Sequence, residues 1–479
     1  MNTYATVVLA AGKGTRMRSI LPKVLHPLTG MPLLAHVLKA IEAIPSTSSF
    51  AALPTPLTSH RPIVVVGYGA EQIEATFGTR CHYALQQEQL GTAHAVLSAM
   101  EAVNTLEPMP QTVLVCYGDT PLVSSDILAR LLVEHETFHA TITFLTAFAD
   151  PSSDFGRVIR DTDGNVREIV EVKRASEEQK RIREVNSGVY CFDRSWLWPN
   201  LKALPRNAAG EYYLTDLIEV AFSQGKKIAT VSGTLAETMG INDRVQLAAA
   251  EQLLRRRILE RHMYAGVTIV DPAATYIDDD VTIGPDTLIL PGTMITGKTS
   301  IGSECSIGPA TTIDQSVIGN ACTVRNSILE ETTLEDEVSV GPFSHCRPGA
   351  YLARNVHMGN FAEVKNSSVG ANTQMHHFSF LGDATVGENV NIGAGAITCN
   401  YNGREKNRTV IGAEAFIGSD TMLIAPVTIG ERARTGAGSV VNKDVAPGTS
   451  VVGMPARRMR SSQPVDNPVN SVTEDGKKE

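Results

Sequence analysis

Cysteine is scarce in this sequence, and the segments that direct a chain into a membrane are lacking. The seven cysteines are Cys81, Cys116, Cys191, Cys305, Cys322, Cys346 and Cys399. Their odd number and wide spacing, without a C-x-x-C pair, suit neither a disulfide framework nor a zinc site. The first residues, MNTYATVVLAAGKG, lack a basic region followed by an apolar one, and no apolar run approaches the length of a membrane span. We therefore expect a reduced, cytoplasmic protein without a membrane partner.

Positive charge is also in deficit. The chain has 42 Lys and Arg residues against 51 Asp and Glu residues, a formal net charge of −9. An acidic surface does not attract nucleic acid or an anionic membrane, so neither is expected as a partner. A local basic pocket can still bind a small phosphorylated substrate. The 479 residues, of which 43% are hydrophobic and 19% charged, are enough for two or three globular domains.

Residues 1–240 alternate short apolar runs with helical patterns. Residues 6–10, 63–66 and 113–116 are apolar runs, each followed by a turn that contains glycine. This alternation predicts a Rossmann-like α/β domain, with a mostly parallel sheet and binding sites at the carboxyl ends of its strands. The stretch between 45 and 60 is rich in Pro, Ser and Thr, and is predicted to be a surface loop.

A linker helix is predicted over residues 241–263. Leu247, Ala250, Leu254 and Ile258 fall on one face of the segment that begins at Asp243. A helix of this length spans about 30 Å at 1.5 Å per residue. It separates two segments whose sequence patterns differ completely.

Residues 264–455 are predicted to form a left-handed parallel β-helix, because apolar residues recur there every six positions. The series are Ile283, Ile289, Ile295, Ile301, Ile307 and Ile313; then Leu334, Val340, Cys346 and Leu352; then Ile411, Ile417, Leu423 and Ile429. An α-helix cannot keep a period of six on one face, whereas a solenoid with three flat sides per coil can. Residues 456–479 are polar and charged, and are predicted to be a disordered tail.

The first apolar run leads directly into a glycine-rich, basic motif. Residues 9–17 read LAAGKGTRM, and residues 22–25 read PKVL. A bound triphosphate needs close backbone approach and free amide groups, which Gly12 and Gly14 offer, and positive charge, which Lys13, Arg16 and Lys23 offer. The P-loop pattern G-x-x-x-x-G-K-[ST] is absent, which excludes that class of NTPase. An isolated G-x-G is more often a tight turn, so the full motif carries the argument.

Together, L-x-x-G-x-G-T-R-M and P-K-x-L resemble the sugar-phosphate nucleotidyltransferase family. The matching residues for UTP and UDP-sugar binding are Leu9, Ala10, Ala11, Gly12, Lys23, Gln86, Gly91, Thr92, Tyr117, Gly118, Asp119, Gly156, Glu171, Asn186 and Asn242. The resemblance implies that the loop from Gln86 reads the uracil. It also implies that Asp119 and Asn242 bind Mg²⁺, which suits a reaction that brings several phosphates together. The alternative for Asp119 is a turn-forming residue before Pro121.

The second half carries three motifs that interrupt the six-residue repeat. They are HCRPGAYLARNVHMGNFAEVKNSSVG from 345, HHFSFLGD from 376 and NVNIGAGAITCNYNG from 389. Their order resembles the family of bifunctional N-acetylglucosamine-1-phosphate uridylyltransferase/glucosamine-1-phosphate acetyltransferases, and the resemblance covers about residues 1–455. It implies that glucosamine 1-phosphate is acetylated by acetyl-CoA, and that UTP and N-acetylglucosamine 1-phosphate then give UDP-N-acetylglucosamine. In bacteria this product is used for peptidoglycan and lipopolysaccharide synthesis.

The resemblance also assigns roles at the acetyltransferase site. His377 is implied as the general base, because an imidazole can accept the amine's proton near neutral pH. The implied acceptor-site residues are Arg347, Lys365, Phe380 and Asn391, and the implied acetyl-CoA residues are Ala394, Asn400, Tyr401, Ser419 and Ala437, with Lys406 near the coenzyme phosphates. Phe380 departs from the family, which commonly has tyrosine there. The family resemblance implies a homotrimer with sites where the solenoids meet.

Three alternatives remain open on the sequence alone. A single-activity nucleotidyltransferase could use the β-helix only for assembly, since a fold does not by itself establish a function. A regulatory subunit could share the same two-domain frame, although Lys23 and Asp119 are both retained. His345, His376 and His377 could belong to a zinc site, as in the solenoid-type carbonic anhydrases.

Overall fold

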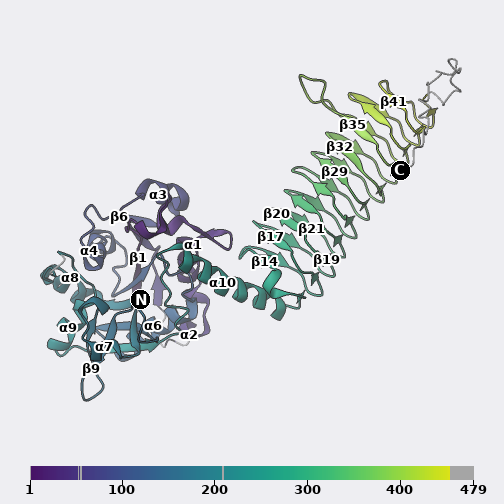
Figure 1. The fold of residues 1–479 in the computed structure, drawn as a ribbon. Helices are drawn as coiled ribbons and strands as arrows, with labels where there is room; N and C mark the ends of the chain where they lie inside the picture. The colour runs from purple at the N-terminus through teal and green to yellow at the C-terminus, as the bar shows by residue number, and fades with distance from the viewer. Residues whose placement is uncertain (1, 52, 54–56, 208–209, 454–479) are drawn as a thin grey trace, which may run out of the picture. The chain divides into compact units, whose positions relative to one another are not determined.

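The computed structural model describes residues 2–51, 53, 57–207 and 210–453, and they divide into two compact units. The first unit comprises Met1–Ile283 and Met294–Thr299, and the second comprises Gly284–Thr293 and the residues from Ser300. Figure 1 shows an α/β fold in the purple-to-teal part and a stack of short strands in the green-to-yellow part. The predicted domain boundaries stay predictions. The predicted tail, residues 456–479, lies outside the described residues.

The first unit is built on a mixed sheet. In sheet order its main strands are β10 (Val166–Val170), β9 (Arg157–Arg160), β11 (Glu184–Asp193), β7 (Thr112–Tyr117), β1 (Asn2–Leu9), β5 (Ile63–Val66) and β6 (His82–Leu85). β7, β1, β5 and β6 run parallel, as predicted, whereas β11 runs antiparallel to β7. Strands β4 (Leu57–Ser59), β8 (Ile142–Phe148) and β12 (Ile228–Ser232) pair with β1, β11 and β8, respectively. The surface loop predicted between 45 and 60 was therefore wrong in part, because this stretch contains β4 and the helix of Ser48–Ala51, and its Phe50 and Leu57 are buried in the core. The strands β2 (Pro27–Leu28) and β3 (Met31–Pro32) form a separate pair.

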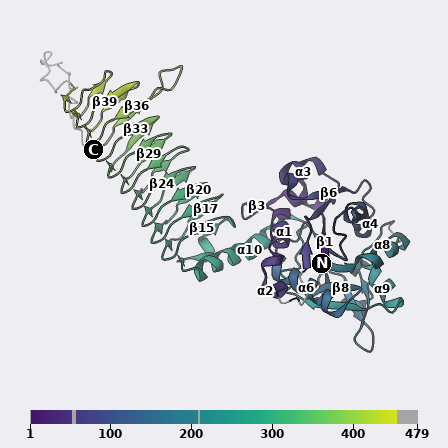
Figure 2. The same cartoon turned by 180° about the vertical axis from the view of Figure 1, so that it is seen from behind.

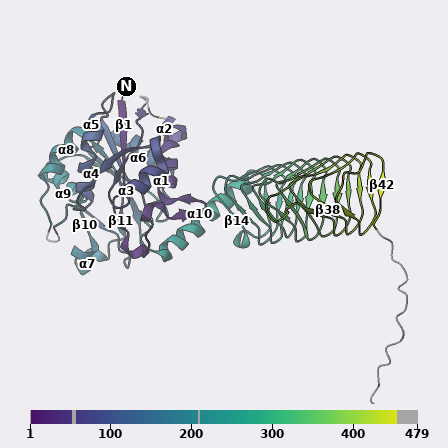
Figure 3. The ribbon, with the colours of Figure 1, turned by 90° about the horizontal axis from the view of Figure 1, so that it is seen from above.

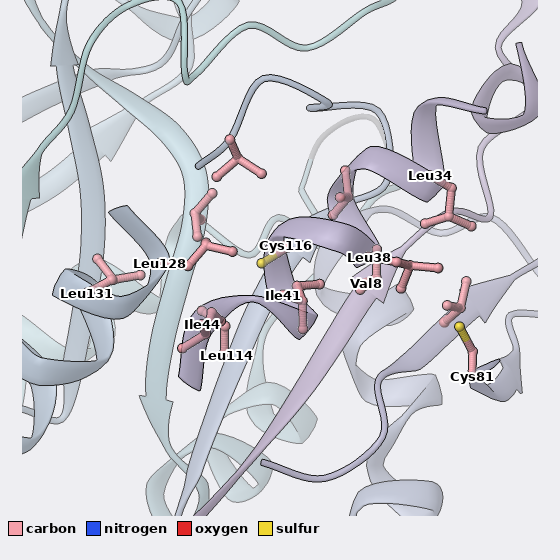
Figure 4. Packing of buried hydrophobic residues seen from close by; sticks show 14 of the residues in the cluster. Val8, Leu34, Leu38, Ile41, Ile44, Cys81, Leu114, Cys116, Leu128 and Leu131 are labelled. Atoms are coloured by element: carbon pink, nitrogen blue, oxygen red, sulfur yellow. The ribbon is translucent and has the colours of Figure 1, made fainter. Parts of the chain in front are cut away.

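Helices cover both faces of this sheet. They are α1 (Leu33–Glu42), α2 (Ser48–Ala51), α3 (Ala70–Phe77), α4 (Thr92–Ser98), α5 (Met100–Asn104), α6 (Ser125–Phe138), α7 (Glu177–Lys180), α8 (Arg194–Ala203) and α9 (Asp216–Ser223). Side chains alternate between the two faces along β1, so Val8 packs with α1 and α6 while Val7 packs with α4, α8 and α9. Figure 4 shows the first of these cores, where Leu38 of α1 and Leu128 of α6 lie around the sheet.

The helix predicted from Asp243 is α10 (Arg244–Tyr264). The Asp243 carboxylate accepts a hydrogen bond from the Gln246 amide at 2.8 Å, which caps the first turn. Of the predicted stripe, Ala250, Leu254 and Ile258 are buried, whereas Leu247 is half-buried. Three short strands of the first unit follow it: β13 (Thr268–Ile269), β14 (Tyr276–Ile277) and β15 (Thr282–Ile283). β14 pairs in parallel with β17 (Met294–Thr296).

The second unit is a left-handed parallel β-helix with three faces, and its coils follow one another evenly in Figure 3. The β16 face contains β16 (Leu288–Ile289), β19 (Ser306–Ile307), β22 (Thr323–Val324), β25 (Ser339–Val340), β28 (His357–Met358), β31 (Gln374–Met375), β34 (Asn391–Ile392), β37 (Phe416–Ile417), β40 (Arg434–Thr435) and β42 (Ser450–Val451). The β20 face contains β20 (Thr312–Asp314), β23 (Ile328–Glu330), β26 (His345–Cys346), β29 (Ala362–Lys365), β32 (Ser379–Gly382), β35 (Ile397–Cys399), β38 (Met422–Ile424) and β41 (Val440–Val441). The β18 face contains β18 (Ser300–Ile301), β21 (Val317–Ile318), β24 (Thr333–Leu334), β27 (Tyr351–Leu352), β30 (Ser368–Val369), β33 (Ala384–Val386), β36 (Thr409–Ile411) and β39 (Val427–Ile429).

All residues of the predicted six-residue series are buried. Ile307, Cys346 and Ile417, for example, are 0% exposed. Each strand is short because the chain must turn a corner after every inward-pointing apolar residue. Many corners use a residue with positive φ, such as Asn366 (45°) and Asp383 (51°), because short polar side chains tolerate this conformation best after glycine. Among the residues that the structure describes, no helix combines the length and apolar character needed to cross a membrane.

Candidate active sites

A cleft of about 320 Å³ opens at the carboxyl ends of β1, β6 and β7 in the first unit. Its lining includes Leu9, Ala10, Ala11, Gly12, Lys23, Gln86, Gly91, Thr92, Tyr117 and Asp119, all of which the sequence predicts for nucleotide binding. Gly118, Gly156, Glu171, Asn186 and Asn242 lie outside this lining. Parallel strands end at a common edge, and that edge brings together segments more than 100 residues apart in the sequence.

The glycine-rich loop is held against the neighbouring strands at its start and left open at Gly12. The Ala10 amide donates to the Val65 carbonyl oxygen at 2.9 Å, and the Gly118 amide donates to the Leu9 carbonyl oxygen at 2.9 Å. A Cβ atom at Gly12 would meet no atom within 4 Å, so the backbone there is free to approach a phosphate. At Gly14, where φ is 58°, a Cβ atom would lie 2.6 Å from the Cβ of Lys23. The glycine therefore lets the loop pass close to this lysine.

Lys23 links the two predicted metal ligands. Its ammonium group forms an ion pair with Asp119 and donates a hydrogen bond to Asn242 Oδ1 at 3.2 Å. Asn242 is kept near Asp119 because the Ile241 amide donates to the Asp119 carbonyl oxygen at 2.9 Å. The Asp119 and Asn242 oxygens thus converge on one cationic nitrogen, although 123 residues separate them in the sequence.

The segment around Tyr212 holds the predicted uracil-reading loop in place through backbone contacts. Gln86 Nε2 donates to the Gly91 carbonyl oxygen at 3.2 Å and lies 3.1 Å from His94 Nδ1. Gly91 has φ 101°, and a Cβ atom there would lie 2.5 Å from the Tyr212 carbonyl oxygen. The Tyr212 amide also donates to the Leu90 carbonyl oxygen at 2.8 Å. Glycine is therefore required at position 91.

Two further polar residues line the cleft, and the sequence analysis missed one of them, Glu211. Gln89 lines the cleft and donates from Nε2 to the Ala11 carbonyl oxygen at 2.8 Å, so it joins the uracil loop to the glycine-rich loop. Gln89 belongs to the loop from Gln86, which the resemblance implies as the reader of the uracil. Glu211 lines the cleft as well, and only the three-dimensional pairing of Tyr212 with Leu90 brings it there.

Gly156, Glu171 and Asn186 gather beside Tyr117. The Asn186 amide donates to the Gly156 carbonyl oxygen at 2.9 Å, and a Cβ atom at Gly156 would lie 3.5 Å from Glu171 Oε1. Burial raises the pKa of Glu171, although a hydrogen bond from Thr215 at 3.4 Å opposes this. Burial also raises the pKa of Tyr117, and the nearby charges of Asp119 and Glu171 add to the effect. The three predicted sugar-binding residues thus form one cluster that adjoins the cleft through Tyr117.

On the second unit, cationic side chains gather on the β20 face. In the parallel register, His345, Glu363 and Phe380 are neighbours on successive coils. Arg347 Nη1 donates to Glu363 Oε1 at 2.9 Å. The pKa of Lys365 is lowered by its contact with Lys406 and by the charges of Arg347 and Lys406. Positive charge therefore exceeds what the carboxylates there neutralise, as a phosphate-binding site requires.

His377 lies at the corner between the β16 and β20 faces, and its side chain is exposed. The backbone of the corner is fixed, because the Gly395 amide donates to the Phe378 carbonyl oxygen at 2.7 Å and Ser379 Oγ donates to the His377 carbonyl oxygen at 2.9 Å. Asn391 on β34 belongs to the β16 face, whereas Phe380 on β32 belongs to the β20 face. The predicted acceptor-site residues therefore lie on both sides of the corner that carries the histidine.

The histidines do not gather into the alternative zinc site. His345 Nε2 lies 2.8 Å from Glu330 Oε2, while the His376 ring lies 6.2 Å from that of His357 and 6.5 Å from that of His377. Within residues 2–453, leaving aside the few that the structure does not describe, no group of three or more His, Cys, Asp and Glu side chains could hold a metal ion. A metal at Asp119 and Asn242 would need ligands from a substrate or water.

The predicted coenzyme residues lie on consecutive coils toward the C-terminal end. Asp420 donates its amide to the Ala394 carbonyl oxygen at 2.7 Å, and Gly438 donates to the Ser419 carbonyl oxygen at 2.8 Å. These bonds place Ala394, Ser419 and Ala437 along one corner. Asn400 and Tyr401 begin the excursion of the chain between β35 and β36, which stands out from the coils in Figure 2.

Comparisons with known proteins define the class of each half. Residues 6–216 match the family described as MobA-like NTP transferase domain, and residues 408–443 match the bacterial transferase hexapeptide (six repeats). The chain is therefore a bifunctional transferase, with a nucleotidyltransferase half and a hexapeptide acyltransferase half.

Relatives that align along almost the whole chain identify the family. The chain is 47% identical over 456 residues to the bifunctional protein GlmU of Heliobacterium modesticaldum, covering 94% of this chain and 96% of the relative. It is 46% identical to those of Geobacillus thermodenitrificans, with 96% and 97% covered, and of Enterococcus faecalis, with 89% and 90% covered. The chain belongs to the family of bifunctional GlmU proteins. The family resemblance and the fold class predicted from the sequence are thereby confirmed.

The raised pKa of Glu171 predicts a pH-dependent stability cost. A carboxyl group whose pKa is higher in the folded than in the unfolded state favours folding at low pH, and this contribution is lost as pH rises through the folded pKa. Glu171→Gln should therefore stabilise the first unit relative to wild type at about pH 7, and much less at about pH 4.

Chemical unfolding followed by tryptophan fluorescence measures this stability, because both tryptophans, Trp196 and Trp198, lie in α8 of the first unit. The exposed Glu74, which lies past the first turn of α3, provides a matched control, since Glu74→Gln should shift the unfolding midpoint little at either pH. Equal effects of Glu171→Gln at both pH values would contradict the assignment of a raised pKa.

Proposed function

We propose that this chain makes UDP-N-acetylglucosamine in two steps. The second unit transfers the acetyl group of acetyl-CoA to the amino group of glucosamine 1-phosphate. The first unit then transfers a uridylyl group from UTP to N-acetylglucosamine 1-phosphate and releases pyrophosphate. The observation that carries the proposal is that one chain of this family holds both a nucleotide-sized cleft with Lys23 and Asp119, and a cationic site beside His377.

In the uridylyl step, an oxygen of the sugar phosphate attacks the α-phosphorus of UTP, and the bond to the pyrophosphate oxygen breaks. The main obstacle is the accumulation of negative charge, so the protein acts mainly by positioning and charge compensation. Gly12 offers open backbone for phosphate approach, and Lys23 brings a positive charge to the same edge. Gln86 and Gln89 carry side-chain amides that suit the edge of a uracil base.

Asp119 and Asn242 would hold the Mg²⁺ ion that the family resemblance implies. Their fit is supported by the way both side-chain oxygens already face one cationic group, the ammonium of Lys23. One carboxylate and one amide leave the other coordination positions to phosphate oxygens and water, which is typical of Mg²⁺. When bound, the ion supplies charge neutralisation at the phosphates. Lys23, which contacts both residues, would then be available to bind a phosphate oxygen.

In the acetyl step, the amine nitrogen of glucosamine 1-phosphate attacks the thioester carbonyl carbon, and the carbon–sulfur bond of acetyl-CoA breaks. His377 would accept the proton that the amine loses, since an exposed imidazole can act as a base near neutral pH. Arg347 and Lys365 would bind the sugar phosphate, with Asn391 on the other side of the corner holding the sugar. Ala394, Asn400, Tyr401, Ser419 and Ala437 would form the coenzyme site, with Lys406 near its phosphates.

Two substitutions should separate the two activities. Asp119→Asn removes a charged metal ligand and should lower uridylyl transfer by roughly 10²-fold or more, while acetyl transfer stays unchanged. His377→Ala should lower acetyl-transfer kcat by about 10²–10⁴-fold and leave uridylyl transfer intact. Pyrophosphate release and thiol release measure the two steps separately.

His376→Ala is the matched control for the histidine, because it removes the adjacent exposed imidazole and should have a much smaller effect. If wild-type protein released no thiol from acetyl-CoA with glucosamine 1-phosphate, the alternative of a single nucleotidyltransferase with a structural β-helix would hold. If Asp119→Asn stopped both steps in a folded protein, the two sites would not be independent.

Phe380 provides a second test of the acceptor site. A tyrosine there would add a hydroxyl group able to hydrogen-bond to the substrate phosphate. Phe380→Tyr should therefore lower KM for glucosamine 1-phosphate, by at most the roughly ten- to hundredfold that one hydrogen bond to a charged group supplies. KM for acetyl-CoA should change little, because the proposed coenzyme residues are others. A change in KM for acetyl-CoA alone would mean that Phe380 belongs to the coenzyme site and not to the acceptor site.

We also propose that the chain assembles as a homotrimer through the β20 face. On the last coils, the outward row of this face is apolar: Phe380, Ile397, Met422 and Val440 are register neighbours. Val440 is 66% exposed, and burying such an exposed apolar side chain against another protein surface is favourable. A solenoid with three flat faces and a site spread over two of them is suited to closure by neighbouring copies.

Val440→Asp should weaken this assembly, because association would bury an unpaired carboxylate. Light scattering should then show smaller particles than for wild type, and acetyl transfer should fall in parallel. Thr385→Asp adds the same charge at an exposed position of the β18 face, and should leave the particle mass unchanged. A wild-type monomer with full acetyltransferase activity would refute the trimer.

A further inference from the structure

A carboxylate that has no assigned role lies between the proposed acceptor and coenzyme sites. Asp383 occupies the corner between β32 and β33, with Asn366 and Asn400 on the coils to either side. Asn366 Nδ2 donates to Asp383 Oδ1 at 2.6 Å, and Asn400 Nδ2 donates to Asp383 Oδ2 at 2.6 Å. Each oxygen of the carboxylate thus holds one amide, and the three side chains form a ladder that joins successive coils.

The same carboxylate faces the lysines of the site. Burial opposes ionisation of Asp383, but the hydrogen bonds from Asn366 and Asn400 and the charges of Lys406 and Lys365 outweigh it and lower its pKa. Asp383 is therefore a stable anion. Its charge acts on Lys365 in the direction opposite to the nearby cations Lys406 and Arg347.

The other carboxylate on this part of the β20 face is already engaged. Glu363 accepts a hydrogen bond from Arg347 at 2.9 Å, so its charge is directed to the guanidinium group. Asp383 consequently provides the negative charge that offsets the two lysines. Without it, Lys365 would face Lys406 and Arg347 with less compensation, and an ammonium group in that position would lose its proton more easily.

Asp383 also fixes the start of the excursion that carries two coenzyme-site residues. The Asn407 amide donates to the Asn400 carbonyl oxygen at 2.7 Å, and Tyr401 and Lys406 form a bridge across the excursion. This segment leaves the coils directly after β35, as Figure 1 shows. By holding the side chain of Asn400, Asp383 anchors the base of the segment.

We propose that Asp383 is a positioning residue shared by both substrates of the acetyl step. It orients Asn400 toward the coenzyme and places a negative charge beside Lys365 and Lys406, the lysines proposed to bind the two sets of phosphates. This role rests on the proposed acetyltransferase function of the second unit. Asp383 itself contacts neither substrate in this proposal. Its effect is transmitted through Asn400, Lys365 and Lys406.

Asp383→Asn tests this role with little change of shape. Asn366 and Asn400 donate to different oxygens of Asp383, so one of them would face the NH2 group of an amide at position 383, and the amide carries no charge. KM for glucosamine 1-phosphate and KM for acetyl-CoA should both rise by about tenfold or more, in line with losing a charge-assisted hydrogen bond. Uridylyl transfer should stay at the wild-type level.

The pH profile separates this role from a structural one. The loss of the Asp383 charge should make Lys365 release its proton at lower pH, so the alkaline rise in KM for glucosamine 1-phosphate should begin at lower pH than in wild type. KM for acetyl-CoA should also rise because the hydrogen bond that holds Asn400 is lost. Asp383→Ser removes the same charge with a smaller side chain, and gives a second variant if the amide variant does not fold.

A matched control exists in another corner ladder. Asp336 accepts hydrogen bonds from the Asn320 amide at 2.6 Å and from Asn320 Nδ2 at 3.1 Å, and it is exposed. Asp336→Asn should leave both KM values and the pH profile at wild-type values. The wild-type protein must be active for this comparison. If Asp383→Asn and Asp336→Asn then both kept the wild-type KM values and pH profile, the proposed role of Asp383 would be overturned. An inactive wild type would instead overturn the proposed acetyltransferase function.

Discussion

Parallel strand pairing is the constraint on which both sites depend. In the first unit, the register of β1 with β7 places Leu9 beside Tyr117, so the glycine-rich loop and Asp119 leave the sheet at one edge. In the second unit, the register through β26, β29 and β32 stacks His345, Glu363 and Phe380 on one face. Segments far apart in sequence thus meet without a dedicated binding domain, because the backbone hydrogen bonds already fix their alignment.

The second requirement is to hold positive charge in an acidic chain. With a net charge of −9, the protein as a whole does not attract phosphates, so each site must concentrate its own cations. Both sites combine a lysine with a neighbouring carboxylate: Lys23 with Asp119, and Lys365 with Asp383. In the first pair the contact is direct, so a cation bound at Asp119 would have to displace Lys23. In the second pair the carboxylate holds asparagines, and its charge acts on the lysines from nearby.

The repeat and the glycine-rich motif carried most of what the sequence could predict. The β-helix was predictable because a period of six directly reflects which residues point inward, as the burial of Ile307, Cys346 and Ile417 shows. The antiparallel β11 was not predicted, because its apolar run is indistinguishable from that of a parallel strand. Glu211 was missed since only the pairing of Tyr212 with Leu90 brings it to the cleft. Corner ladders such as that of Asp383 involve single polar residues 17 positions apart, which leave no apolar signal.

The side chain of Phe380, where the family commonly has tyrosine, lies between a glycine and an apolar row. A Cβ atom at Gly382 would lie 2.5 Å from Phe380 Cζ and 2.7 Å from Asn400 Nδ2, so the ring covers the glycine close to Asn400. The ring also continues the apolar row of Ile397 on the next coil. A phenylalanine thus extends the apolar surface by one coil toward the cationic residues, but offers no hydrogen bond to a phosphate. If Arg347 and Lys365 bind the sugar phosphate as proposed, they would have to supply that binding, and the charge that Asp383 places near Lys365 would matter more in this chain.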